Sequence, residues 1–169
     1  MTAQGRPTPS IAAMVEGYVK AFDENDLDRV MTHFADDAVY HPPAGDERMG
    51  LAAIRRELEP QFRGVYGAMR FDELDRLVDE TSRKALTRWI CRHDLTHARP
   101  TTLALKIERV VVGALVGTRF GWEGVDVFHF DAGGKIKALF SYGTWARRPR
   151  LRKELGVPLP PMPRPHQAG

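Results

Sequence analysis

The chain has 169 residues, a net charge of +3 and 43% hydrophobic residues, which is typical of one globular domain with a hydrophobic core. The positive charge lies in residues 147–169, which contain six Lys and Arg residues and one Glu, so the preceding body is slightly acidic. This distribution excludes a strongly basic domain, and we expect no nucleic-acid partner.

The first half of the chain has the pattern of three helices. Residues 1–9 contain glycine and two prolines and are interpreted as a flexible arm. Apolar residues at helical spacing from Ile11 to Phe22 predict a helix with Ser10 as its N-cap. A shorter helix is expected from Leu27 to Phe34, then an extended piece at residues 39–40 that two prolines end. Apolar residues on one side of residues 51–62 predict a third helix.

The second half has the pattern of a sheet. Residues 69–80 are assigned to a strand, because a strand meander needs an opening strand there, although their apolar period also suits a helix. Residues 84–96 are expected to form a strand buried on both faces, with Cys91 as a small core residue. Residues 119–130 and 136–142 are predicted to form a hairpin. The single cysteine excludes an internal disulfide and fits a reducing, cytoplasmic location.

An insertion at residues 98–118 separates two of these strands. Its apolar residues from Leu103 to Leu115 predict a helix that serves as a lid over a pocket or as an interface pad; a long hairpin of β-branched residues is the alternative. Its longest apolar run is too short to cross a bilayer, so no membrane partner is expected. Residues 10–146 are therefore one domain, and residues 147–169 form a basic, proline-rich tail.

Tyr18 and Asp126 are the most informative polar residues. Tyr18 lies on the inner stripe of the first helix, and Asp126 interrupts an apolar strand. Valine and phenylalanine flank Asp126, so burial should raise its pKa. A neutral carboxyl beside a phenol can donate two hydrogen bonds to one substrate oxygen, as in an oxyanion hole. The alternative is a structural acid in a sheet. The histidines lack zinc-ligand spacing, so neither a metal nor another cofactor is expected.

Three segments of the chain also carry a family resemblance. They are residues 18–28, residues 33–41 with 50–54, and the hairpin at 125–136. In this order and spacing they resemble the SnoaL-like and ketosteroid-isomerase-like group of the NTF2-like superfamily. The resemblance implies an α+β cone, in which a curved antiparallel sheet wraps around a long N-terminal helix and encloses a central apolar pocket. It also implies a homodimer through the sheet and a small hydrophobic ligand.

The resemblance assigns roles to individual residues. Tyr18 and Asp126 match the tyrosine and the protonated aspartic acid that hydrogen-bond the substrate oxygen in ketosteroid isomerase. The general-base aspartate of that enzyme falls at Pro42, so the neighbouring His41 is the candidate base. The expected pocket lining consists of Val15, Phe22, Phe34, Ile90, Phe128, Leu139 and Ser141.

These residues favour a cofactor-independent isomerase, cyclase or dehydratase that moves protons on a small hydrophobic or polycyclic carbonyl or hydroxyl compound. An alternative resemblance, to limonene-epoxide hydrolase, rests on Tyr40, Arg92 and Asp94; a simple ion pair on one strand face also explains the last two. Because His93 alternates with them, both sets cannot face one pocket. A non-catalytic ligand-binding or assembly module is the third hypothesis, since a fold does not decide a function.

Overall fold

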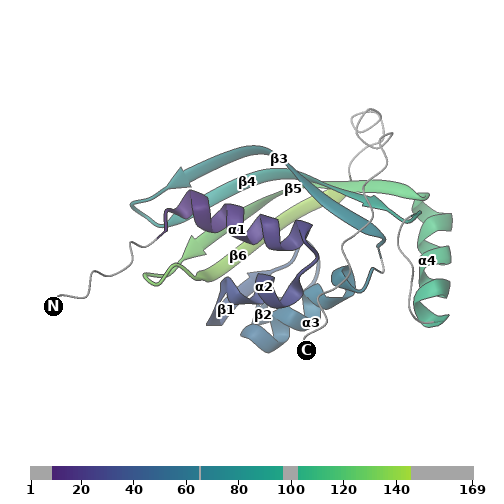
Figure 1. Cartoon of the computed structure of the whole chain (residues 1–169), viewed down its shortest axis with the longest axis horizontal. Helices are drawn as coiled ribbons and strands as arrows, with labels where there is room; N and C mark the ends of the chain where they lie inside the picture. The colour runs from purple at the N-terminus through teal and green to yellow at the C-terminus, as the bar shows by residue number, and fades with distance from the viewer. Residues whose placement is uncertain (1–8, 65, 97–102, 146–169) are drawn as a thin grey trace.

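The computed structural model describes residues 9–64, 66–96 and 103–145, and a curved sheet covered by helices dominates this part (Figure 1). The elements in chain order are α1 (Ile11–Asp23), α2 (Leu27–Thr32), β1 (Phe34–His41), β2 (Arg48–Met49), α3 (Leu51–Phe62), β3 (Ala68–Asp79), β4 (Lys84–Asp94), α4 (Leu103–Val116), β5 (Arg119–Phe130) and β6 (Ile136–Trp145). The six strands have the order β2-β1-β6-β5-β4-β3. The α+β class is therefore confirmed.

The sheet is mixed rather than wholly antiparallel. All neighbouring strands run antiparallel except β1 and β6, which pair in parallel. The reason is that the last strand of the chain returns to the free edge of β1, after the β3–β4–β5 meander has been completed. This pairing also changes one helix boundary: α2 ends at Thr32, and Phe34 pairs with Ile136 instead of continuing the helix.

Helix α1 packs on the sheet through one apolar face (Figure 1). Its N-cap Ser10 accepts a hydrogen bond from the Ala13 backbone N–H through Oγ, at 3.2 Å. Ile11 and Val15 on the packed face are no more than 2% exposed. Burial of apolar surface stabilises this contact by roughly 25 cal/mol per Å². The same face carries Tyr18, so the packing of α1 directs the phenol toward the sheet.

The structure confirms the expected strand at residues 69–80 but contradicts the expected burial of the next strand. The assignment of residues 69–80 to a strand is confirmed, because β3 pairs with β4 from Ala68 to Asp79. The expectation that the next strand is buried on both faces was wrong. In β4 the alternate residues from Ala85 to His93 are buried, while Arg88 on the opposite face is exposed. The sheet therefore has one face toward the helices and one outer face.

The insertion forms a helix, so the hairpin alternative is wrong. Helix α4 lies at one end of the sheet (Figure 1). Its apolar stripe is open in the single chain: Leu103 is 73% exposed and Leu115 is 78% exposed. Leu115 also lines the cavity described below, and both the lid and the interface pad remain predictions. Residues 98–102, the arm up to residue 8 and the tail at 147–169 lie outside the described residues.

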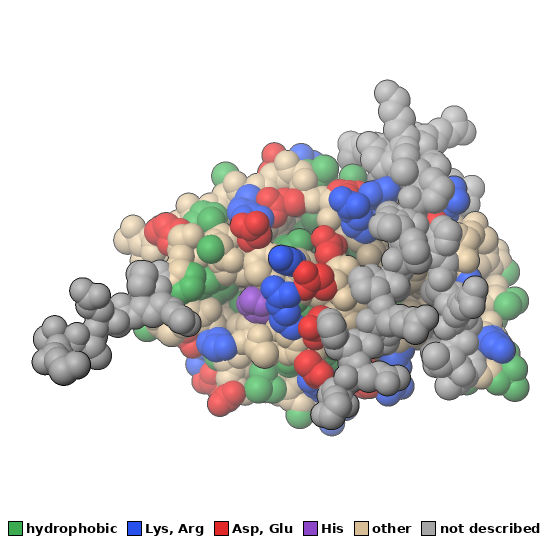
Figure 2. Space-filling model, in the orientation of Figure 1, with side chains coloured by type: hydrophobic (Ala, Val, Ile, Leu, Met, Phe, Trp, Pro, Cys, Tyr) green, Lys and Arg blue, Asp and Glu red, His purple; other side chains and the backbone are tan. Residues whose placement is uncertain are grey.

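Charged side chains of both signs are mixed on the described surface. On the face in Figure 2, acidic and basic side chains are interleaved. Ion pairs such as Arg76–Glu73 and Arg48–Glu57, both at 2.7 Å, join such side chains in the described chain. Within the described residues, no helix combines the length and the apolar character needed to cross a membrane.

Candidate functional site

A cavity of about 660 Å³ lies where the inner face of the sheet meets α1 and α3. This volume suits a small organic molecule. The walls are mainly apolar and aromatic, and their side chains include Val19, Phe22, Leu58, Phe71, Trp89, Phe120 and Trp122. Such walls favour a hydrophobic ligand, because the ligand loses apolar surface to water when it binds.

Polar side chains on three adjacent strands form a row across one wall. Thr87, Asp126 and Ser141 face one another in register on β4, β5 and β6. They are buried, with 3%, 9% and 7% exposure, and all three line the cavity. The Ser141 hydroxyl donates a hydrogen bond to Asp126 Oδ1 at 2.6 Å. The row therefore places a hydrogen-bonded carboxyl inside an otherwise apolar space.

The environment of Asp126 shifts its protonation toward neutral pH. Burial raises the pKa of the carboxyl to about 7, while Ser141 and the Trp89 indole oppose this rise. The indole acts on Asp126 from nearby, but Trp89 Nε1 forms no hydrogen bond of normal geometry with the described residues. A group with a pKa near 7 can both accept and release a proton under physiological conditions.

Two phenols share this region of the cavity. Tyr18 and Tyr40 both line it, and burial, followed by the charge of Asp126, raises the pKa of each phenol. Aromatic contacts fix the Tyr18 ring, including Phe22 at 5.1 Å and Phe128 at 5.5 Å between ring centroids. Among the described residues, none hydrogen-bonds to the Tyr18 hydroxyl. This phenol remains protonated and can donate to a ligand oxygen.

His41 lies outside the cavity. Its Nε2 is 2.6 Å from Glu47 Oε1, and its ring stacks on Phe140 with centroids 4.6 Å apart. It is absent from the cavity lining, whereas the preceding Tyr40 belongs to it. The cause is strand parity: β1 continues to residue 41, so consecutive side chains point to opposite faces of the sheet. His41 is therefore not positioned as a base for this cavity.

Arg92 and Asp94 also fall outside the cavity lining. Arg92 forms an ion pair with Asp72 on β3. Asp94 is 1% exposed and accepts hydrogen bonds from the Thr96 backbone N–H at 2.8 Å and from Arg119 Nε at 3.2 Å. His93, between them, does line the cavity. The strand register therefore places His93 on the inner face. The epoxide-hydrolase set of Tyr40, Arg92 and Asp94 does not meet in the cavity, because only Tyr40 lines it.

Only part of the expected lining reaches the cavity. Phe22 and Ser141 line it. Four other expected residues, Val15, Phe34, Phe128 and Leu139, are no more than 3% exposed and belong to the packed core. Ile90 alternates with the inward residues of β4 and lies on the outer face. The inward residues Thr87, Trp89, Cys91 and His93 of β4 also line the cavity. The sequence analysis did not name Thr87 or Cys91 as lining residues, although their period-two spacing in a buried strand was a usable signal.

Gly124 supplies the space that the Trp89 ring occupies. A Cβ on Gly124 would lie 2.6 Å from that ring and 2.4 Å from the Tyr142 carbonyl oxygen, whereas a Cβ on Gly143 would lie 3.5 Å from the same ring. We expect Gly124→Ala to lower the free energy of unfolding by about 1–3 kcal/mol because of overpacking. Gly143→Ala is the matched control and should have a much smaller effect in urea unfolding. Equal effects would contradict this account.

Comparisons with known proteins agree with this fold. A family model described as the SnoaL-like domain matches residues 15–139. The epoxide hydrolase/cyclase-like enzyme SalBIII has a similar structure, with a TM-score of 0.59 and 18% identity over 80% of this chain and 90% of that chain. An NTF2-like protein of unknown function from Exiguobacterium sp. 255-15 has a TM-score of 0.56 and 18% identity over 78% and 98%. A candidate polyketide cyclase from Pseudomonas putida KT2440 has a TM-score of 0.57 and 15% identity over 79% and 91%. Identities this low show a shared NTF2-like fold.

Proposed function

Because this chain belongs to the SnoaL-like domain family, we propose that it is a cofactor-independent proton-transfer enzyme acting on a small hydrophobic carbonyl compound. The observation that carries the proposal is the buried Asp126 carboxyl in the cavity wall, with its pKa raised to about 7 by burial. Its reaction class includes isomerisation, cyclisation by aldol-type closure, and dehydration, because each begins with removal of a proton beside a carbonyl group.

In the proposed mechanism, the Asp126 carboxylate removes a proton from the carbon next to the carbonyl group. The electrons of the broken C–H bond move into an enolate, whose oxygen accepts a hydrogen bond from the Tyr18 hydroxyl. The Ser141 hydroxyl donates a hydrogen bond to Asp126 Oδ1. In this mechanism the other oxygen, Oδ2, takes the proton. Protonated Asp126 then returns the proton to a different atom of the same molecule or to a departing hydroxyl group.

The other titratable residues of the cavity are less suited to this step. Glu57 pairs with Arg48 at 2.7 Å, and Glu73 pairs with Arg76 at the same distance. Burial lowers the pKa of His93 to about 4, so protonating it at neutral pH is unfavourable. Asp126 therefore has the pKa that best matches proton exchange near pH 7. This role replaces the one expected for His41, which lies on the outer face.

Two structural neighbours support a cyclisation or related reaction within this class. One is described as having a role in pyran ring formation in polyether salinomycin, and another as a candidate polyketide cyclase. Ring closures of this kind require proton transfers at oxygen or carbon inside a space that excludes water. The cavity described above offers an apolar space with a titratable carboxyl, which is the chemistry that such a reaction needs.

The proposal can be tested without knowledge of the natural substrate. The protein is incubated in deuterium oxide with β-tetralone, an apolar ketone with acidic C–H bonds, and loss of the corresponding proton signal is followed by NMR. We expect saturable acceleration above the buffer rate, because binding precedes proton removal. Binding of the ketone without accelerated exchange would support a non-catalytic ligand-binding module instead.

We also propose that the chain forms a homodimer through the outer face of the sheet. Leu77, Leu86, Val127 and Phe140 lie in register across four neighbouring strands on this face. Leu77 is 67% exposed in the single chain. Such a continuous apolar strip is costly to leave in water, and pairing two copies would cover it.

Val127→Arg should convert the homodimer into a monomer, because two copies would bury unpaired positive charges at one interface. Sedimentation velocity at micromolar concentration measures the change in mass. Leu103→Arg on α4 is the matched control and should leave the dimer intact. A wild-type monomer would contradict the proposal, and loss of the dimer only in Leu103→Arg would identify α4 as the interface.

A further inference from the structure

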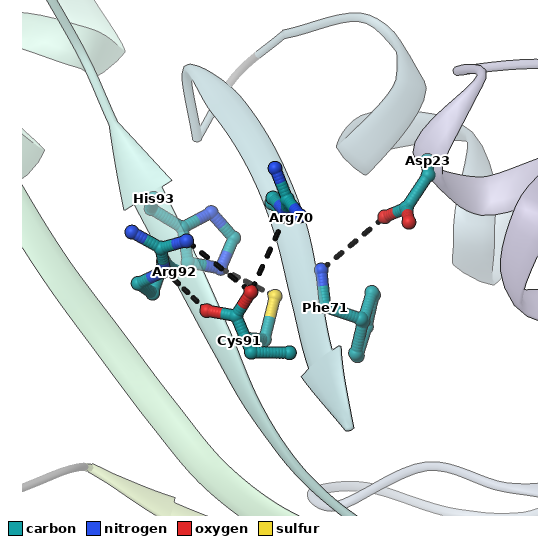
Figure 3. A network of polar contacts seen from close by, with 7 residues as sticks. Asp23, Arg70, Phe71, Cys91, Arg92 and His93 are labelled. Atoms are coloured by element: carbon teal, nitrogen blue, oxygen red, sulfur yellow. Dashed lines mark hydrogen bonds and ion pairs between the residues drawn. The ribbon is translucent and has the colours of Figure 1, made fainter. Parts of the chain in front are cut away.

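The inner face of β4 carries a second reactive pair in the same cavity. Cys91 and His93 are two residues apart, so their side chains lie on the same face, and both line the cavity. The distance from Cys91 Sγ to His93 Nε2 is 3.3 Å (Figure 3). Both side chains are buried, with 4% and 6% exposure. The proton-transfer mechanism above uses neither of them.

The surroundings of His93 determine which nitrogen can act as a base. His93 Nδ1 is 3.3 Å from the Tyr66 backbone carbonyl oxygen, which can only accept a hydrogen bond, so Nδ1 carries the proton. Nε2 is then the acceptor and takes a hydrogen bond from the Cys91 thiol. The imidazole ring also stacks on Phe120, with centroids 4.7 Å apart and an angle of 10° between the planes. This is the arrangement of nucleophile, base and orienting group found in nucleophilic catalysis.

The pair is neutral when no ligand is bound. Burial raises the pKa of the Cys91 thiol well above its usual value, and burial lowers the pKa of His93 to about 4. A buried neutral thiol reacts slowly with reagents from water. Apolar walls formed by Phe71, Phe120 and Trp122 surround the pair and favour an apolar reaction partner.

A buried hydrogen-bond donor lies on the same face of β4 as this pair. Trp89 is the preceding inward residue of β4, and it is 7% exposed. The Trp89 side chain lines the same cavity, and its buried Nε1 has no hydrogen-bond partner of normal geometry among the described residues, although the indole acts on the Asp126 carboxyl. Leaving a buried N–H without a partner costs about 1–3 kcal/mol, so an acceptor supplied by a ligand would be stabilised there.

We propose that Cys91 and His93 form a thiol–imidazole pair that adds reversibly to an apolar α,β-unsaturated carbonyl compound bound in the cavity. The Cys91 sulfur forms a bond to the β-carbon, and the electrons of the C=C bond move toward the carbonyl to give an enolate. His93 Nε2 takes the thiol proton and delivers it to the α-carbon. The net change is addition of S–H across the double bond, with nothing oxidised or reduced, and the reverse elimination restores both partners. The addition does not require Asp126 to be catalytic.

The test uses the whole chain and benzylideneacetone, an apolar enone. Because Cys91 is the only cysteine, intact-protein mass spectrometry reports its modification directly. We expect a single adduct whose rate of formation saturates with enone concentration and exceeds the rate for acrylamide, a polar acceptor. Benzylacetone, the saturated ketone, should give no adduct and should slow the reaction by competing for the cavity. Cys91→Ala should give no adduct.

His93→Gln should lower the adduct rate by about 100-fold or more, since it removes the base but keeps a polar side chain of similar size. A rate for His93→Gln equal to that of the wild type would overturn the role of His93. A wild-type rate that does not saturate and equals that of the urea-unfolded chain would overturn the site itself; this comparison needs no variant and so stands even if His93→Gln fails to fold. Adduct mass and proton exchange are separate readouts, so failure of one proposal leaves the other measurable.

Discussion

Replacing Asp126 with Asn should slow the exchange of β-tetralone protons by at least about 100-fold, because an amide cannot accept the proton. Asn retains an oxygen that can accept the hydrogen bond from the Ser141 hydroxyl, so the row across the sheet keeps its shape. The matched control is Asp37→Asn, which removes an exposed carboxyl paired with Lys137. Full exchange activity in Asp126→Asn would remove Asp126 from the mechanism.

The pH dependence gives the same prediction a second readout. Asp126 acts as a base only when ionised, and burial raises its pKa to about 7. The wild-type exchange rate should therefore rise with pH up to about 7 and level off above it, and Asp126→Asn should lack this rise. A rate that falls as the pH increases through 7 would instead indicate that protonated Asp126 is a hydrogen-bond donor to the substrate oxygen.

Tyr18→Phe should lower the same rate by about 100-fold, because the enolate oxygen loses a buried donor. Tyr142→Phe is the matched control, since Tyr142 is 63% exposed and lies on the outer face of β6. If both variants lose activity equally, the effect comes from the sheet and not from the cavity. If neither loses activity, Tyr18 is not the donor.

Asp126→Asn should also stabilise the protein above pH 7, by an amount on the order of 4 kcal/mol. Burial raises the folded-state pKa of Asp126 from 3.8 to about 7, so the folded state holds this proton more tightly than the unfolded state. One pKa unit corresponds to about 1.4 kcal/mol. The wild-type stability therefore decreases as the pH rises from about 4 to about 7, and Asn escapes this loss because it does not ionise.

Urea unfolding of both proteins over this pH range measures the effect. The difference between their free energies of unfolding should be small near pH 4, grow as the pH rises and become constant above pH 7. Asp37→Asn should show no such gain, since ion pairing with Lys137 lowers the pKa of Asp37. A pH-independent difference for Asp126→Asn would show that the carboxyl is not held near neutrality by burial. A variant that is more stable but inactive is expected when an ionised carboxylate lowers the stability of the protein and is needed for catalysis.

The open apolar stripe of α4 shows the limit of local pattern reading. The spacing from Leu103 to Leu115 predicts a helix, and the structure contains one. The same spacing predicts a lid or an interface pad, and Leu103 is 73% exposed in the single chain. Periodicity reports which residues share a helix face, but only long-range packing decides what that face contacts.

The sequence by itself determined most of the element types, and it placed Tyr18 and Asp126 on inward faces. Helical spacing placed Tyr18 on the inner face of α1, and the apolar flanks of Asp126 indicated a buried carboxyl with a raised pKa. Both follow from local rules, since side-chain period and the polarity of near neighbours can be read along the chain.

Tertiary structure alone decided which face of each strand meets the cavity. In residues 92–94, either His93 or the pair of Arg92 and Asp94 could face the cavity. Pairing of β4 with β3 and β5 placed His93 inward and Arg92 outward. In the same way, the parallel pairing of β1 with β6 set Tyr40 toward the cavity and His41 away from it. A shift of register by one residue would reverse each choice without changing the local sequence, because side chains alternate along a strand. The alignment of Thr87, Asp126 and Ser141 depends on three strands that meet only in the folded sheet.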